Sequence, residues 1–122
     1  MRFDPSAHAA RAEHALVVVF LDLKGFAAQS ARVTDAEIAT QLDAYYAKVT
    51  ARVTAAGGHV VKFIGDGALV VFHRASADAA VQACLDLKHD LDAWLADLGW
   101  RCELIAKVHA GDVIVGPFGG TL

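Results

Sequence analysis

The chain is poor in the residues and segments that mark several large classes of protein. It has only two cysteines, with neither the CxxC spacing nor the nearby histidine pair of a zinc or redox site, so we expect both thiols to be reduced and buried. The longest apolar run, Ala15 to Leu21, is far shorter than the roughly 20 residues that span a bilayer. The sequence therefore predicts neither a disulfide framework nor a transmembrane helix.

The chain also lacks an excess of basic charge and a hydrophobic leader. Its formal net charge is −3 without any basic block, which argues against duplex nucleic acid as a partner. Residues 1–5 lack the apolar core of a secretory signal, so a cytoplasmic location is expected. With 122 residues, 56% of them hydrophobic, the chain suits one domain with its own core. We expect an N-terminal extension over 1–14 and the domain over 15–122.

The hydrophobic pattern predicts a central strand and two long helices. Branched apolar residues from Ala15 to Leu21 favour a strand buried on both faces that ends at Asp22. A helix is expected from the T-x-x-E capping pattern at Thr34 to the glycine pair at Gly57, because apolar residues recur there at helical spacing. A second helix is expected between Ser76 and Gly99.

Two β-hairpins complete the prediction. The runs 59–64 and 68–72 are joined by Gly65-Asp66-Gly67, a turn that carries Asp66 at its tip. The runs 102–110 and 113–115 are expected to form another hairpin around Gly111-Asp112. The resulting order is a ferredoxin-like α+β arrangement, βαββαβ, with an extra C-terminal β-hairpin strand. Its first and third strands are neighbours, so Asp22 and Asp66 are expected to converge.

Three motifs occur in order along the chain. They are Phe20-x-Asp22-x-x-Gly25-Phe26, Gly57-Gly58-x-Val60-x-Lys62-x-Ile64-Gly65-Asp66 and Val108-His109-x-Gly111-x-Val113-x-x-Gly116. Together they resemble the catalytic domain of class III nucleotidyl cyclases, the adenylate and guanylate cyclases. The resemblance extends from about residue 15 to residue 119. It implies the palm-type cyclase fold and a homodimer whose active sites lie between the two subunits.

By this resemblance, Asp22 and Asp66 are the catalytic residues and bind two divalent cations, Mg²⁺ or Mn²⁺. The main-chain carbonyl of Leu23 is implied as a further ligand. Hard cations prefer carboxylate oxygen, and paired cations stabilise the attacking and leaving oxygens of an in-line displacement. The backbone amides of Lys24, Gly25 and Phe26 are expected to bind phosphate oxygens. The implied reaction converts a nucleoside triphosphate into a cyclic 3′,5′-monophosphate and pyrophosphate.

Lys62 stands where adenylyl cyclases of the family carry a base-reading lysine and guanylyl cyclases commonly carry glutamate. Lysine only donates hydrogen bonds, which suits a ring-nitrogen acceptor of adenine, so the resemblance implies ATP rather than GTP.

Two departures from the family pattern matter. Ala27 replaces the Thr or Ser that often follows the Gly-Phe pair. The later family segment, which carries an asparagine and an arginine that support the ribose and the transition state, has no counterpart here.

A lost charge-stabilising donor costs about a hundredfold or more in rate. We therefore expect this chain to have weak or no activity alone, either as a fragment of a longer enzyme or as a short relative.

Other interpretations of the same residues stay open. Asp22 and Asp66 also suit turn positions where carboxylates accept bonds from backbone amides, and Lys62 suits a solvated strand position. His109, beside a hairpin glycine, is expected to be structural. The alternatives to an adenylyl cyclase are a guanylyl cyclase and a non-catalytic cyclase-homology module for nucleotide binding or dimerisation. A diguanylate cyclase is a weaker alternative, because the chain has no GG[DE]EF turn.

Overall fold

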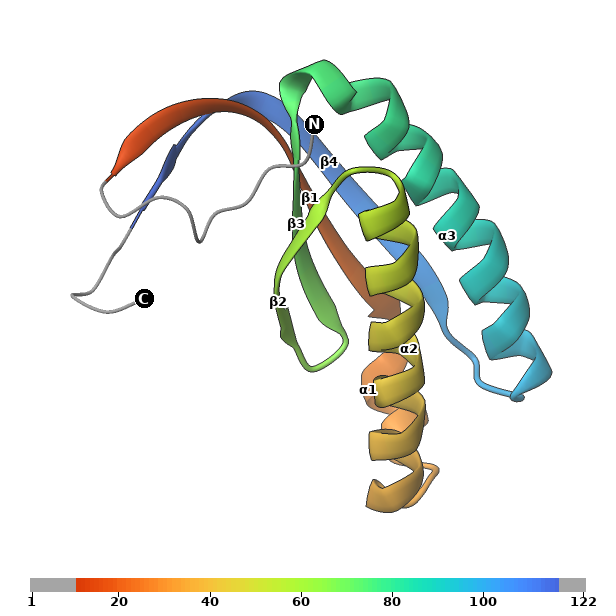
Figure 1. Ribbon diagram of the computed structural model, residues 1–122. Coiled ribbons are helices and arrows are strands. Elements are labelled where there is room, and N and C mark those ends of the chain that lie inside the picture. Colours follow the sequence, from red (N-terminus) through yellow and green to blue (C-terminus); the bar gives the residue numbers. More distant parts are fainter. Residues whose placement is uncertain (1–10, 117–122) are drawn as a thin grey trace.

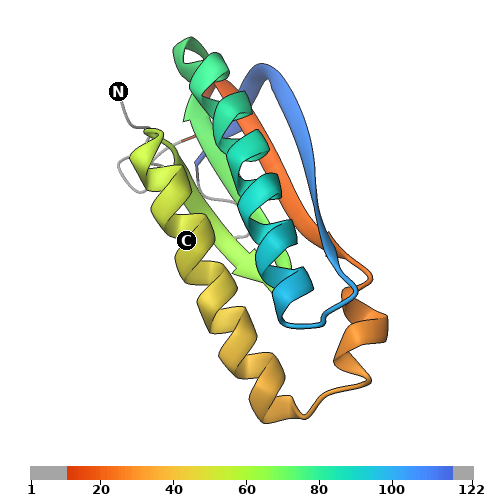
Figure 2. The same ribbon diagram turned by 90° about the vertical axis from the view of Figure 1, so that its right-hand side faces the viewer.

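Two long helices cover one face of a four-stranded antiparallel sheet, as Figures 1 and 2 show. The computed structural model describes residues 11–116, and its strand order is β2-β3-β1-β4. The elements in chain order are β1 (Ala12–Lys24), α1 (Phe26–Ser30), α2 (Asp35–Ala55), β2 (His59–Ile64), β3 (Gly67–His73), a 3₁₀ turn (Arg74–Ser76), α3 (Ala77–Asp97) and β4 (Glu103–Val115). This order confirms the predicted ferredoxin-like α+β arrangement.

Strand β1 is central, as predicted, and its residues alternate between the two faces of the sheet. Val17, Val19, Leu21 and Leu23 are each no more than 4% exposed and pack in the core beneath α2 and α3. The residues between them lie on the face that no helix of residues 11–116 covers. A smaller apolar cluster centred on Leu16 lies on that second face.

The predicted start and end of α2 are confirmed. The Thr34 hydroxyl accepts a hydrogen bond from the backbone N–H of Glu37 at 3.2 Å, which satisfies one of the free donors at the helix start. After Ala55 the chain turns at Gly57, whose φ of +86° favours glycine. The helix therefore ends, and β2 begins after it, at the position that the sequence indicates.

The predicted hairpin between β2 and β3 is also confirmed. Ile64 pairs with Gly67, so the connecting loop consists of Gly65 and Asp66 alone. Gly65 has a φ of +54° at the first loop position, where two-residue hairpin loops favour glycine. This tight turn fixes the position of Asp66 relative to both strands.

The predicted second hairpin, around Gly111-Asp112, is wrong. Residues Glu103–Val115 form one continuous strand that pairs with β1 along its whole length, from Lys24 to Ala12. Because β1 begins at Ala12, the last residues of β4 find a partner without turning back. A Cβ at Gly111 would lie 2.9 Å from Nε2 of His109, so this glycine makes room for the His109 ring instead of forming a turn.

Three further expectations concern the cysteines, the membrane and the N-terminal extension. Both cysteines are free thiols, with Cys84 buried and Cys102 half-buried. None of the helices in this range has the length and hydropathy required to span a bilayer. Of the expected N-terminal extension, residues 1–10 lie outside the described residues, and 12–14 belong to β1.

Candidate metal and nucleotide site

Asp22 and Asp66 converge at one end of the sheet. Asp22 lies near the end of β1, and Asp66 lies in the turn between β2 and β3, which is beside β1 because β1 pairs with β3. The carboxylate oxygen Oδ2 of Asp66 accepts a hydrogen bond from the backbone N–H of Leu23 at 2.9 Å. The predicted approach of these two segments, which are separated by more than forty positions, is confirmed.

An open hollow of about 740 Å³ lies at this end of the sheet. Most of the residues that the sequence singles out contribute to its wall. The lining residues are Phe20, Asp22, Leu23, Gly25, Phe26, Ala27, Ala28, Ile64, Asp66 and Gly67. The hollow thus combines two carboxylates with the backbone of the loop that follows β1.

The two carboxylates have the chemistry of a site for a hard cation. The Asp22 carboxylate has no hydrogen bond or ion pair with any residue in 11–116, and the Asp66 carboxylate uses only Oδ2, for the Leu23 amide. No group of three or more potential metal-ligating side chains occurs in this part of the chain. Mg²⁺ is commonly bound by one or two carboxylates together with substrate phosphates. Asp22 and Asp66 fit that form of binding better than an all-protein cage.

Electrostatic effects place both negative charges near the same buried group. Burial raises the pKa of the Tyr45 phenol, and the charges of Asp66 and then Asp22 raise it further. Burial also raises the pKa of the Cys102 thiol, with a further increase from Asp66. The site therefore carries a local negative potential, which favours cations and disfavours further anionic groups.

The loop after β1 contains a position that only glycine fits. Gly25 has a φ of +86°, and a Cβ there would lie 2.6 Å from the carbonyl oxygen of Arg101. This geometry lets the chain turn from β1 directly into the five-residue helix α1. The Lys24 side chain points elsewhere, because it lies 3.7 Å from a carboxylate oxygen of Glu103 and is 72% exposed. The backbone of this loop, and not the Lys24 ammonium, adjoins the two aspartates.

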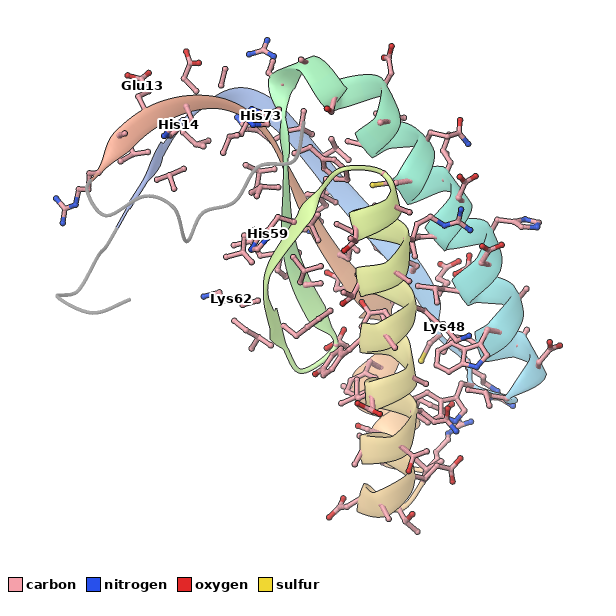
Figure 3. All side chains as sticks on the ribbon, in the orientation of Figure 1. Glu13, His14, Lys48, His59, Lys62 and His73 are labelled. Carbon is pink, nitrogen blue, oxygen red and sulfur yellow. The ribbon has the colours of Figure 1, made fainter. Side chains whose placement is uncertain are left out.

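Lys62 does not join the two aspartates within one chain. It lies on β2 opposite Leu69, is exposed, and projects away from α2 in Figure 3. Together with Val18 and Val71 it lines a separate hollow of about 450 Å³ on the face of the sheet opposite the helices. Lys62 is thus available to a molecule that approaches this face.

The sequence pattern did not identify two tyrosines that contact the Asp66 turn. Tyr45 and Tyr46 lie within the apolar periodicity of α2, which gives no indication of the partners of their hydroxyls. Both hydroxyls donate to carbonyl groups of the turn between β2 and β3. The signal that could have identified them is their adjacency, since consecutive helical residues face different directions and a buried hydroxyl needs a partner.

Comparisons with known proteins agree with this geometry. The chain is 25% identical over 114 residues to an adenylate cyclase of Anabaena cylindrica, which covers 87% of this chain and 23% of that protein. It is 28% identical over 110 residues to adenylate cyclase 2 of Rhizobium meliloti, covering 84% of this chain and 30% of that protein. The crystal structure of the guanylyl cyclase Cya2 aligns with a TM-score of 0.77 at 25% identity, covering 93% of this chain and 61% of that one.

The chain has the fold of class III nucleotidyl cyclase domains and is similar in sequence to two adenylate cyclases. No family model matches the chain, so this conclusion rests on the relatives and on the fold. The chain spans less than a third of the curated relatives named above, at 23% and 30% of their lengths. These relatives and the solved structure include both adenylyl and guanylyl cyclases.

Proposed function

We propose that this cyclase domain contributes the metal-binding half of an adenylyl cyclase active site, which converts ATP into 3′,5′-cyclic AMP and pyrophosphate. The observation that carries the proposal is the convergence of Asp22 and Asp66 in one open hollow beside the loop after β1. The similarity to two proteins named adenylate cyclases supports the same reaction class.

In this proposal Asp22, Asp66 and the main-chain carbonyl of Leu23 hold two divalent cations, Mg²⁺ or Mn²⁺. When bound, such cations stabilise the attacking and leaving oxygens of a phosphoryl displacement. The 3′-hydroxyl of ATP loses its proton and its oxygen bonds to the α-phosphorus, while the bond from that phosphorus to pyrophosphate breaks. The backbone amides of Lys24, Gly25 and Phe26 bind phosphate oxygens and orient the triphosphate.

We further propose that Lys62 reads the adenine base in the active site of a second subunit. The support is geometric, because Lys62 lines a hollow on the face of the sheet opposite the helices and the aspartates line a different one. A side chain that donates only suits an acceptor nitrogen of adenine. A homodimer that brings Lys62 of one subunit to the aspartates of the other completes the site, so monomers are expected to be inactive.

The assay that tests this function measures cyclic nucleotide by chromatography. The 122-residue chain and its full-length parent are each incubated with ATP or GTP in the presence of Mn²⁺. We expect cyclic AMP from the parent and little or none from the 122-residue chain alone. Cyclic GMP from GTP in place of cyclic AMP from ATP would contradict the assignment of ATP and favour a guanylyl cyclase.

Matched aspartate variants separate the catalytic role from general effects. In the parent, Asp66→Asn is expected to lose Mn²⁺-dependent activity, whereas Asp97→Asn, at an exposed position in the last turn of α3, is expected to retain it. The Asp66 carboxylate accepts a backbone hydrogen bond, which also suits a purely structural role in a non-catalytic nucleotide-binding module. If the parent binds nucleotide but forms no cyclic product, the result would favour the non-catalytic module over the cyclase.

A further inference from the structure

Two neighbouring tyrosines of α2 hold the turn that carries Asp66. The Tyr45 hydroxyl donates a hydrogen bond to the main-chain carbonyl of Asp66 at 2.9 Å, and the Tyr46 hydroxyl donates to that of Gly65 at 2.5 Å. Gly65 and Asp66 are the two residues that join β2 to β3. One helix therefore fixes both carbonyl groups at the tip of the turn.

The two tyrosines differ in their surroundings. Tyr45 is 1% exposed and belongs to the main core, whereas Tyr46 is half-buried and stacks on Phe63 with ring centroids 4.1 Å apart. The hydrogen bond from Tyr45 to the turn is partly buried, whereas that from Tyr46 is exposed to solvent. Tyr45 is thus the more constrained of the two anchors.

Asp66 is held at both of its ends. Its carbonyl accepts from Tyr45 on the helix side, and its carboxylate accepts from the Leu23 amide on the strand side. Leu23 directly follows Asp22 on the central strand. A continuous series of contacts therefore runs from α2, through Asp66, to the segment that bears Asp22.

We propose that Tyr45 is a positioning residue whose hydroxyl fixes the Asp66 main chain so that the Asp66 carboxylate meets the Leu23 amide beside Asp22. The effect that this positioning has on metal binding rests on the function proposed above, in which both carboxylates hold cations. The competing interpretation is a core tyrosine whose hydroxyl is merely satisfied. In that case its removal lowers stability throughout the domain without displacing Asp66.

Hydrogen exchange at the Leu23 amide tests the positioning without any assay of function. In Tyr45→Phe the Asp66 carbonyl loses its donor, and we expect exchange at Leu23 to accelerate relative to Val19 by about three- to tenfold, the range for one lost intramolecular hydrogen bond. Val19 serves as the internal reference because it pairs with both β3 and β4. Equal acceleration at Leu23 and Val19, or no change at Leu23, would overturn the proposal.

Val49→Ala is the matched control variant. Val49 is fully buried on the same helix, one turn after Tyr45, and makes no hydrogen bond to the Asp66 turn. Its truncation removes core packing, so we expect exchange at Leu23 and Val19 to accelerate together. A selective effect at Leu23 in this variant would show that any loss of core packing releases Asp66, and the specific role of the Tyr45 hydroxyl would then be wrong.

Direct Mn²⁺ binding, followed by loss of the free-ion signal in electron paramagnetic resonance, tests the consequence. We expect the dissociation constant to rise about three- to tenfold in Tyr45→Phe and to be unchanged in folded Val49→Ala. Unchanged Mn²⁺ binding in Tyr45→Phe would overturn the inference and leave the proposed function intact. Absence of Mn²⁺ binding in the unsubstituted chain, with Leu23 exchange still dependent on Tyr45, would overturn the proposed function while the positioning role stands.

Discussion

The two faces of strand β1 differ sharply in what they contact. On one face, Leu21 and its alternate neighbours are buried beneath α2 and α3. On the other face, Phe20 is 42% exposed and Asp22 lines the open hollow that also holds Asp66. Because strand side chains alternate with a period of two, adjacent residues of β1 lie on opposite faces of the sheet and have different surroundings. The helix-covered face stabilises the fold, and the opposite face contributes Asp22 to the proposed cation site.

Replacement of a core residue of β1 should give the largest loss of stability. Leu21→Ala removes a side chain that is 1% exposed, so we expect the free energy of unfolding to fall by about 2–5 kcal/mol. Urea denaturation followed by circular dichroism measures this change. A loss below about 1 kcal/mol would show that the helix-covered face does not carry the stability of the domain.

The neighbouring residue on the opposite face should give the reverse result. Asp22→Asn in the full-length parent is expected to lower Mn²⁺-dependent cyclase activity by about a hundredfold or more, because the cation site proposed above would lose one of its two charges. Its free energy of unfolding should change by no more than about 0.5 kcal/mol, since the Asp22 side chain makes no hydrogen bond in the described residues. Equal losses of stability in Asp22→Asn and Leu21→Ala would remove the distinction between the faces.

Alkaline pH should weaken the helix-covered face through Tyr45. Its pKa is raised in the folded chain, whereas an unfolded tyrosine ionises near pH 10, so the folded state favours the protonated phenol. The stabilisation is complete below about pH 10 and is lost as the pH rises toward the folded pKa. Denaturation midpoints between pH 8 and pH 11, in about one-unit steps, should therefore fall less in Tyr45→Phe than in the unsubstituted chain.

Tyr46→Phe serves as the control for this measurement, because it keeps Tyr45 and should keep the full alkaline loss. The pKa of Cys84 is also raised by burial, so its thiol adds to the loss in every variant and does not affect the difference between them. An identical alkaline profile in Tyr45→Phe and in the unsubstituted chain would contradict the assignment to Tyr45.

The smallest effect is expected at Phe20. Because its ring is already 42% exposed, Phe20→Thr should lower the free energy of unfolding by about 1 kcal/mol, roughly half the value for a fully buried side chain. Threonine keeps the strand preference of the position. The same denaturation experiment measures it, and a loss as large as that of Leu21→Ala would mean that another molecule or subunit covers this face in solution.

The sequence was sufficient to predict the features that depend on local chemistry. The Thr34 cap, the turn at Gly65 and the strand order that brings Asp22 to Asp66 all follow from capping, turn and topology rules. The continuity of β4 at Gly111 could not be predicted in this way. A glycine and an aspartate in succession favour a turn locally, and only the length of the neighbouring strand keeps the segment extended.

The contacts of the tyrosines escaped prediction for a related reason. Helical periodicity shows that Tyr45 faces the core, but the partner of its hydroxyl depends on where the turn between β2 and β3 lies in the fold. Similarly, the position of Lys62 on the strand can be predicted, whereas the lining of two different hollows by Lys62 and the aspartates depends on how the strands are arranged in the fold.

The most direct test of the central claim is an NMR titration of the isotope-labelled 122-residue chain with Mn²⁺, whose unpaired electrons broaden the signals of nearby amides. We predict that the amides of Asp22, Leu23 and Asp66 broaden together and first, and that Asp66→Asn greatly reduces this effect. Broadening that begins at another acidic position, such as Asp86 and Asp90 on α3, or no selective broadening at all, would contradict a cation site between Asp22 and Asp66.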